Sequence, residues 1–101
     1  MYSRLDLHET LCQILGSRNV YYQPPQNLKM TYPCIVYQLD RIENRQAENG
    51  VHAQFHQYNI TIIDPRPDNA AIHKMSRLAR SRYDRHYVAD GLNHDSFTIY
   101  Y

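Results

Sequence analysis

The 101-residue sequence is long enough for one domain, which would bury roughly two-thirds of the surface that the unfolded chain exposes. Its 11 Lys and Arg residues nearly balance 10 Asp and Glu residues, and the formal net charge of +1 gives little basis for tight binding to a phosphate backbone. Apolar runs are much shorter than the roughly 18 residues that cross a bilayer, and the N-terminus lacks the regions of a signal peptide. We therefore expect a single domain over residues 1–101, soluble and made in the cytoplasm, without nucleic acid or membrane as a favoured partner.

Cysteine and tyrosine use gives two further indications. Cys12 and Cys34 have apolar neighbours, the usual setting of a buried, reduced thiol. The 10 tyrosines, with no tryptophan, supply large contact areas with polar tips, which suit surfaces that become buried on assembly. A tyrosine at the edge of a thin core is, for any single position, the more common case.

The first half of the chain predicts one helix and two strands. Apolar residues at helical spacing indicate a helix over residues 3–15, followed by Gly16 at its C-terminal end. Residues 20–23 are β-branched and aromatic and indicate a short edge strand that stops at Pro24-Pro25. The next strand starts at Tyr32-Pro33, apolar on both faces at first and on one face later, so it should leave the core as it advances.

A long hairpin is predicted in the middle of the chain. Asn49-Gly50 is the strongest turn signal, because both residues tolerate the positive φ of a type I′ turn. It joins the second strand to a return strand over residues 51–64, and on both arms the polar residues lie near the turn. We expect the tip of this hairpin to project beyond the core.

The second half predicts a helix followed by two strands. A proline-containing connection over residues 64–69 places Asp68 or Asn69 to cap a helix over about residues 70–80. Strands over residues 83–89 and 94–101, joined by a turn at Asp90-Gly91, close the chain. The order α-β-β-β-α-β-β predicts an α+β fold, a mostly antiparallel sheet covered by two helices on one face.

Residues that could carry chemistry are better explained by structural roles. His52 and His56 would lie about 13 Å apart on one strand face, too far to share a zinc ion. Neither cysteine has an exposed, electropositive setting, and each of the 3 glycines ends a helix or makes a turn, which leaves no phosphate-binding loop. Asp64 and Asp68 flank prolines and a helix start, where capping explains them. We expect no enzyme activity, no catalytic residues, no cofactor and no metal.

A cluster of arginines follows the second predicted helix, at Arg77, Arg80, Arg82 and Arg85. A small nucleic-acid-binding or toxin-like domain, the alternative from a different class, would have to use this strip. The strip is not interleaved with a platform of exposed aromatic residues, and acidic residues balance its charge. We interpret it as an ion-pair surface toward another subunit, with a solvated surface as an equally common explanation.

Three stretches carry a family resemblance: "YPCIVYQLDRIENRQAENG", "QYNITIIDPRPDN" and "RHYVADGLNHDSFTIYY". Together they resemble the tail-completion (tail terminator) or head-tail joining proteins of long-tailed bacteriophages and prophages, over nearly the whole chain and without any catalytic motif. The resemblance implies a structural virion protein at the head-tail junction, forming a ring, commonly hexameric, between the tail tube protein and the head-closure or connector protein. DNA would pass through the lumen without specific binding, consistent with the weak charge. Another neck component, a head-closure or connector protein, is the alternative within this class.

A ring built from head-to-tail contacts needs two different complementary patches on each subunit. The hairpin and the arginine cluster are the two candidates, and an exposed ribbon can also add to the sheet of a neighbour. Charges on the hairpin are expected to set the register between neighbours. The expected subunit-interface residues are Arg41, Glu43, Arg45, Glu48, His52, Phe55, Arg77, Arg80, Arg82 and Arg85.

Overall fold

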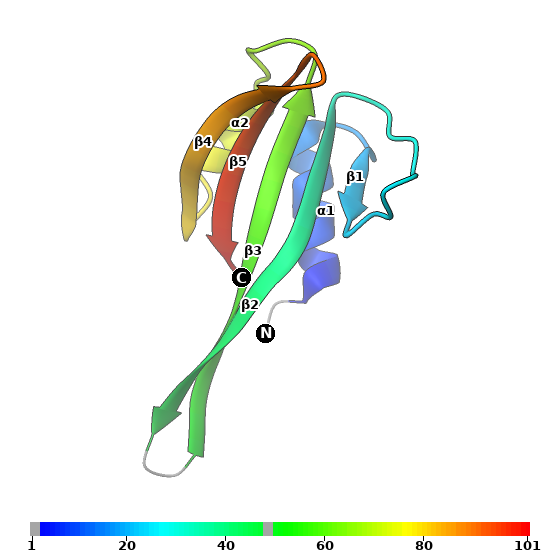
Figure 1. Ribbon diagram of the computed structural model, residues 1–101. Helices are drawn as coiled ribbons and strands as arrows, with labels where there is room; N and C mark the ends of the chain where they lie inside the picture. Colours follow the sequence, from blue (N-terminus) through cyan, green and yellow to red (C-terminus); the bar gives the residue numbers. More distant parts are fainter. Residues whose placement is uncertain (1–2, 48–49) are drawn as a thin grey trace.

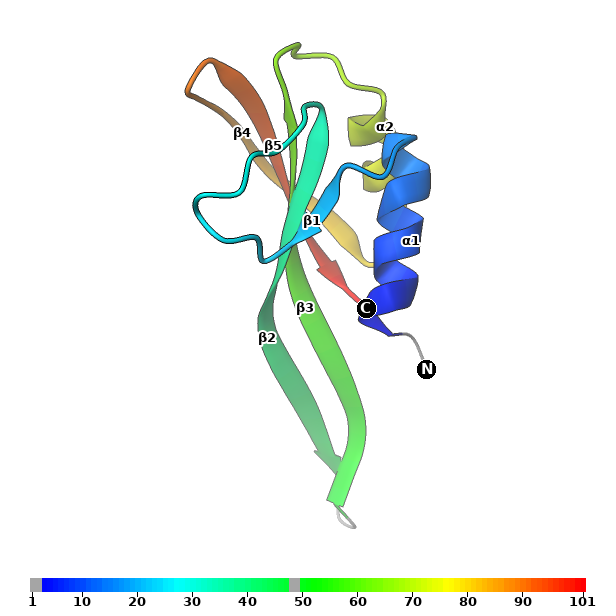
Figure 2. The same cartoon turned by 90° about the vertical axis from the view of Figure 1, so that its right-hand side faces the viewer.

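The computed structural model describes residues 3–47 and 50–101, with side chains except at positions 45–47 and 50–53. A five-stranded mixed sheet has the strand order β1-β2-β3-β5-β4, and both helices lie on one side of it (Figure 1, Figure 2). The predicted α+β class is confirmed. The elements are α1 (Arg4–Leu15), β1 (Val20–Tyr22), β2 (Cys34–Ala47), β3 (Gly50–Asp64), α2 (Ala71–Ser76), β4 (Ser81–Ala89) and β5 (Leu92–Tyr100).

The sheet is mixed because of its first strand. β1 runs parallel to β2, with Val20 opposite Ile35, whereas the pairs β2–β3, β3–β5 and β4–β5 are antiparallel. β4 and β5 join through a tight turn in which Asp90 (φ 54°) and Gly91 (φ 72°) both adopt positive φ, as a type I′ turn requires. β5, the last strand in the chain, therefore lies between β3 and β4.

Helix α1 has well-defined ends. The Ser3 side chain accepts a hydrogen bond from the Asp6 amide while the Asp6 carboxylate accepts from the Ser3 amide, which is a capping box. At the other end Gly16 takes φ 81°, a left-handed conformation that costs glycine little, and donates its N–H to the Cys12 carbonyl. These two caps fix the helix close to its predicted bounds.

Helix α2 is shorter than predicted. It ends at Ser76, and the expectation of helix through residue 80 is wrong, because the chain turns there to enter β4. Arg80 adopts a left-handed φ of 64°, and the Ser81 hydroxyl lies within hydrogen-bonding distance of the carbonyl oxygens of Met75 and Leu78. That hydroxyl takes the place of further helical hydrogen bonds.

The start of α2 uses one of the two predicted capping residues. The Asn69 side-chain oxygen accepts from the Ala71 amide at 2.8 Å, although Ala70 occupies the N-cap position itself. Asn69 in turn donates to the buried carboxylate of Asp64 at 2.8 Å, and that carboxylate also accepts from the Arg66 amide. Asp64 thus holds the connection between β3 and α2 in place.

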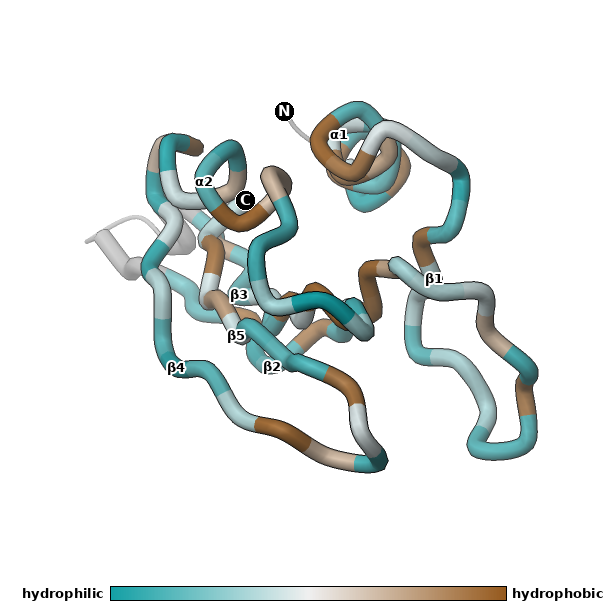
Figure 3. The backbone as a smooth tube through the Cα atoms, turned by 90° about the horizontal axis from the view of Figure 1, so that it is seen from above, coloured by the Kyte–Doolittle hydropathy of each residue, from teal (hydrophilic) through white to brown (hydrophobic). Residues whose placement is uncertain are grey.

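The hydrophobic core lies between the helices and the sheet, which form two layers when viewed from above (Figure 3). Leu7, Leu11 and Met75 from the helices are fully buried against the sheet. Cys12 and Cys34 are buried free cysteines, as the sequence predicts. Neither of the helices described in residues 3–47 and 50–101 has the length and apolar character needed to cross a membrane. The main core residues of the strands are Ile35, Tyr37, Tyr58, Ile60, Ile62, Phe97 and Ile99.

The β2–β3 ribbon extends past the end of the remaining sheet (Figure 1, Figure 2). β3 pairs with β5 from Gln57 to Asp64, and β2 pairs with β1 only from Ile35 to Tyr37, whereas β2 and β3 continue to pair as far as Ala47 and Gly50. A register shift between Leu39 and Arg41 marks the base of the ribbon. The molecule measures 51 × 29 × 22 Å, elongated as a consequence. The predicted Asn49-Gly50 turn lies partly outside the described residues.

Candidate subunit interface

The charged residues at the base of the ribbon lie on one of its faces. Arg41 and Glu43 alternate along β2 and are exposed, with 3.7 Å between Nη2 of Arg41 and Oε2 of Glu43. Phe55 lies directly opposite Glu43 in the register of β3 and so belongs to the same face. Such an exposed ion pair contributes little to stability, about 0–1 kcal/mol, and its groups are available to other partners.

Arg80 joins this face from a distant part of the chain. Its guanidinium carbon lies 5.7 Å from the centroid of the Phe55 ring, within the range of a cation–π contact. The Arg80 carbonyl accepts from the Tyr100 amide at 3.2 Å, which fixes the start of β4 against the end of β5. A cavity of about 330 Å³ at this point is lined by Glu43, Phe55, Arg80 and Tyr100.

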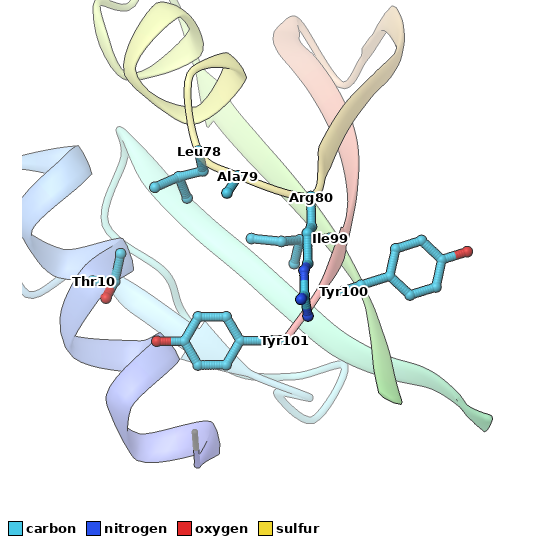
Figure 4. Close-up of a pocket in the computed structure, with 7 residues that line it drawn as sticks. All are labelled: Thr10, Leu78, Ala79, Arg80, Ile99, Tyr100 and Tyr101. Atoms are coloured by element: carbon cyan, nitrogen blue, oxygen red, sulfur yellow. The ribbon is translucent and has the colours of Figure 1, made fainter. Parts of the chain in front are cut away.

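A second cavity, of about 410 Å³, adjoins the first because Arg80 and Tyr100 line both. In Figure 4 the Arg80 side chain extends between the rings of Tyr100 and Tyr101. The Tyr101 amide donates to the His56 carbonyl at 2.9 Å, which fixes this residue beside β3. We call the two cavities together the Arg80 groove; the second is lined by Thr10, Leu78, Ala79, Arg80, Ile99, Tyr100 and Tyr101.

Arg82 does not contribute a free charge to the predicted basic strip. Its Nε donates to the Asp84 carboxylate at 2.8 Å, and Nη2 lies 3.4 Å from the Thr98 hydroxyl. Thr98 donates to the other oxygen of Asp84 at 2.6 Å, at the irregularity in the β4–β5 register. This closed network ties β4 to β5, so Arg82 serves the fold.

Arg85 is also engaged within the molecule. Its guanidinium lies 4.8 Å from the centroid of Tyr87, whose ring stacks on His94 at 4.7 Å. Strand alternation brings Arg85 and Tyr87 to one face, so one aromatic residue does lie beside this arginine. Arg85 and His94 nevertheless cover the Tyr87 ring from two sides, which leaves little of it for stacking on a nucleotide base.

The structure describes the side chains of only some of the remaining predicted interface residues. Arg77 follows α2 as its C-cap and is exposed. The side chains of Arg45 and His52, and all of Glu48, lie outside the described residues. Of the predicted set, the structure brings Arg41, Glu43, Phe55 and Arg80 to one face. Arg77, Arg82 and Arg85 lie apart from this group.

Several residues of the groove were not predicted from the sequence. Leu78, Ala79, Tyr100 and Tyr101 line it because the chain leaves α2 early and because β5 lies beside β3. The tyrosine-rich composition pointed to surfaces of this kind without indicating positions. Arg80 could be placed only once its left-handed backbone was known.

The chemistry available in the described part of the chain is limited. Burial raises the pKa of the Cys34 thiol to about 11 and also raises that of Cys12, so neither forms a ready thiolate. Within residues 3–47 and 50–101, His, Cys, Asp and Glu form no group of three that could hold a metal ion. What the arrangement offers is an apolar groove with an arginine where its two cavities adjoin, a geometry suited to contact with another polypeptide.

Neither the models of known protein families nor the curated proteins compared with this sequence match it.

Proposed function

We propose that this chain is a structural virion protein of a tailed bacteriophage, a tail terminator or head-tail joining subunit that forms a ring at the head-tail interface. The observation that carries the proposal is the β2–β3 ribbon, which continues beyond the pairing of β3 with β5. The second support for the proposal is the resemblance of three long stretches of the sequence to tail-completion proteins.

The physics of an isolated ribbon supports an intersubunit role. A two-stranded ribbon is at best marginally stable in water, and its outer edges carry backbone groups that lack strand partners within the described residues. Ile42, on this ribbon, is 49% exposed. A neighbouring subunit would cover the apolar side chain and supply main-chain hydrogen bonds to the free edge.

In this proposal the ribbon of one subunit contacts the next, and a heterologous contact of this kind closes into a ring. The ring, hexameric as in the family that the chain resembles, would sit between the tail tube and the head-closure or connector protein. Its near-neutral charge would let DNA pass without tight binding to the phosphates. No catalytic step is required of the chain.

The deciding experiment removes the ribbon. A variant in which residues 41–55 are replaced by a short turn should keep the circular dichroism of the folded protein but remain monomeric. The wild-type chain should form rings of several 12.0 kDa subunits, measured by light scattering with size-exclusion chromatography and seen by negative-stain microscopy. Rings formed by the shortened variant would contradict the proposal.

A binding experiment tests the alternative from a different class. Wild-type protein should not bind duplex DNA tightly at physiological salt or be retained by heparin in a salt-dependent manner. Tight, salt-dependent binding would instead favour a nucleic-acid-binding domain, because such binding scales with the phosphates neutralised.

A further inference from the structure

We propose that the turn between β4 and β5 of one copy docks in the Arg80 groove of the next copy, as a second head-to-tail contact beside that of the ribbon. This inference rests on the proposed ring and names a contact within it. Two surfaces of the same chain carry it: the groove, and a tip patch that consists of Val88 and Asp90.

The groove contains a cation without a carboxylate partner among the described residues. The structure pairs Arg18 with Glu9, Arg66 with Asp64 and Arg82 with Asp84, but gives Arg80 only the ring of Phe55. Glu43 lines one of the two cavities together with Arg80, but among the described residues its carboxylate forms an ion pair with Arg41, at 3.7 Å, and not with Arg80. An occupant of the groove should therefore bring a negative charge together with an apolar side chain.

The tip patch has this composition. Val88 is 63% exposed, unusually so for a β-branched apolar side chain, and Asp90 is exposed at the turn that follows. No hydrogen bond or ion pair engages the carboxylate of Asp90 within the part of the chain described.

The two surfaces cannot meet within one molecule. Ala89 pairs with Leu92 at the tip end of the β4–β5 hairpin, and Ser81 pairs with Ile99 at the groove end. Strands of nine residues separate these ends by roughly 26 Å, at about 3.3 Å per residue. Complementary patches at opposite ends of one hairpin produce a head-to-tail contact between copies, which closes a ring or extends a filament.

The tip alone is too small to hold an assembly together. Stable interfaces bury about 1,200–2,000 Å² in total, more than a β-turn can supply. We therefore propose that this contact sets the orientation of the next subunit. It would do so through the Arg80–Asp90 charge pair and through contact of Val88 with Leu78 in the groove. Opposite charges at such a contact favour one register over others.

Cysteine crosslinking tests the contact directly. Copies carrying Ala79→Cys, in the groove, are mixed with copies carrying Val88→Cys, and the mixture is oxidised under non-denaturing conditions. The native cysteines Cys12 and Cys34 are buried, so they should contribute little background crosslinking. A disulfide-linked dimer is expected from this mixture but not from the control, Ala79→Cys mixed with Leu28→Cys, which places the second thiol in the loop after β1. Equal crosslinking in the two mixtures, or none in either, would overturn the inference.

Charge reversal supplies the second readout. Arg80→Glu and Asp90→Arg should each raise the protein concentration at half-assembly about tenfold, equivalent to about 1.4 kcal/mol, and the double reversal should restore most of the loss. Lys29→Glu, an exposed charge reversal elsewhere, should leave assembly unchanged. Additive losses in the double variant would refute the pairing, provided that circular dichroism shows each variant folded.

The two proposals can fail separately. Rings of wild-type protein without the specific crosslink would leave the ring function intact and remove the tip contact. A specific crosslink without any ring would retain the contact and argue against the head-tail function.

Discussion

The hydroxyl of Tyr37 lies 2.8 Å from Nδ1 of His8 and accepts a hydrogen bond from Nη1 of Arg4 at 3.1 Å. Tyr37 is completely buried, so these two side chains of α1 replace water around its polar atom. Nδ1 of a neutral His8 can accept the hydroxyl proton of Tyr37 in the tautomer that leaves this nitrogen unprotonated. A protonated imidazole would instead present an N–H at that position and could not accept.

This arrangement makes stability depend on pH below about 6.5. Burial lowers the pKa of His8 below its ordinary 6.5, with the charges of Arg4 and Arg18 acting in the same direction and Glu9 against them. As pH falls below about 6.5, the unfolded chain binds more protons than the folded one. The contribution of neutral His8 to the free energy of unfolding is therefore complete above that pH and decreases as pH falls to the lowered pKa of the folded state. Between pH 7 and pH 5.5, the free energy of unfolding measured in urea should fall less for His8→Gln than for wild type. An identical fall in the two proteins would exclude His8 as the cause.

A pair of leucines on α1 separates core packing from helix propensity. Leu11 is fully buried, whereas Leu5 is 65% exposed on the same helix. Leu11→Ala should lower the free energy of unfolding by about 2–5 kcal/mol, because it leaves a cavity against the sheet. Leu5→Ala should change it by less than about 0.5 kcal/mol. Chemical denaturation measures both, and similar losses would contradict the placement of α1.

A pair of aspartates tests the connection between β3 and α2. Asp64 is 3% exposed and accepts from the Arg66 amide and the Asn69 side chain, whereas Asp68 is exposed. Asp64→Ala should cost about 1–3 kcal/mol in unfolding free energy, because it leaves buried donors without an acceptor. Asp68→Ala serves as the matched control and should be nearly neutral; a larger effect at Asp68 would show that it is the capping residue.

The cysteines should resist modification in the folded protein. Burial raises the pKa of the Cys34 thiol to about 11, so the reactive thiolate is scarce at pH 7.5 as well as shielded. Reaction with a thiol reagent such as Ellman's reagent should be slow in buffer and rapid in urea for both Cys12 and Cys34. Rapid stoichiometric labelling of native protein would mean that these sites open readily.

Local patterns in the sequence predicted the elements whose ends have a local cause. Helix α1 has a Ser3 cap and a Gly16 terminus, and the Asp90-Gly91 turn needs two residues that tolerate positive φ, so each could be read without knowledge of the fold. The length of α2 could not, because its end depends on the Ser81 hydroxyl and on an arginine in a conformation that arginine seldom adopts. The parallel direction of β1 depends equally on tertiary packing.

The candidate interface, too, could be predicted only in part from local patterns in the sequence. The exposed charges Arg41 and Glu43 follow from strand alternation alone. The approach of Arg80 to Phe55 follows from the β3-β5-β4 order, which no local pattern specifies. The arginine cluster looked uniform in sequence, yet Arg82 and Arg80 differ because only Arg82 has Asp84 beside it.

The position of β5 between β3 and β4 also constrains when this protein can fold. β4 emerges from the ribosome before β5, but its only strand partner in the described structure is β5. Phe97 and Ile99, which complete the core, belong to that same late strand. A nascent chain that ends before β5 can form the β2–β3 pairing, but the backbone groups of β4 and of one edge of β3 then lack strand partners. Cooperative folding of this domain must therefore wait until translation of β5 is complete.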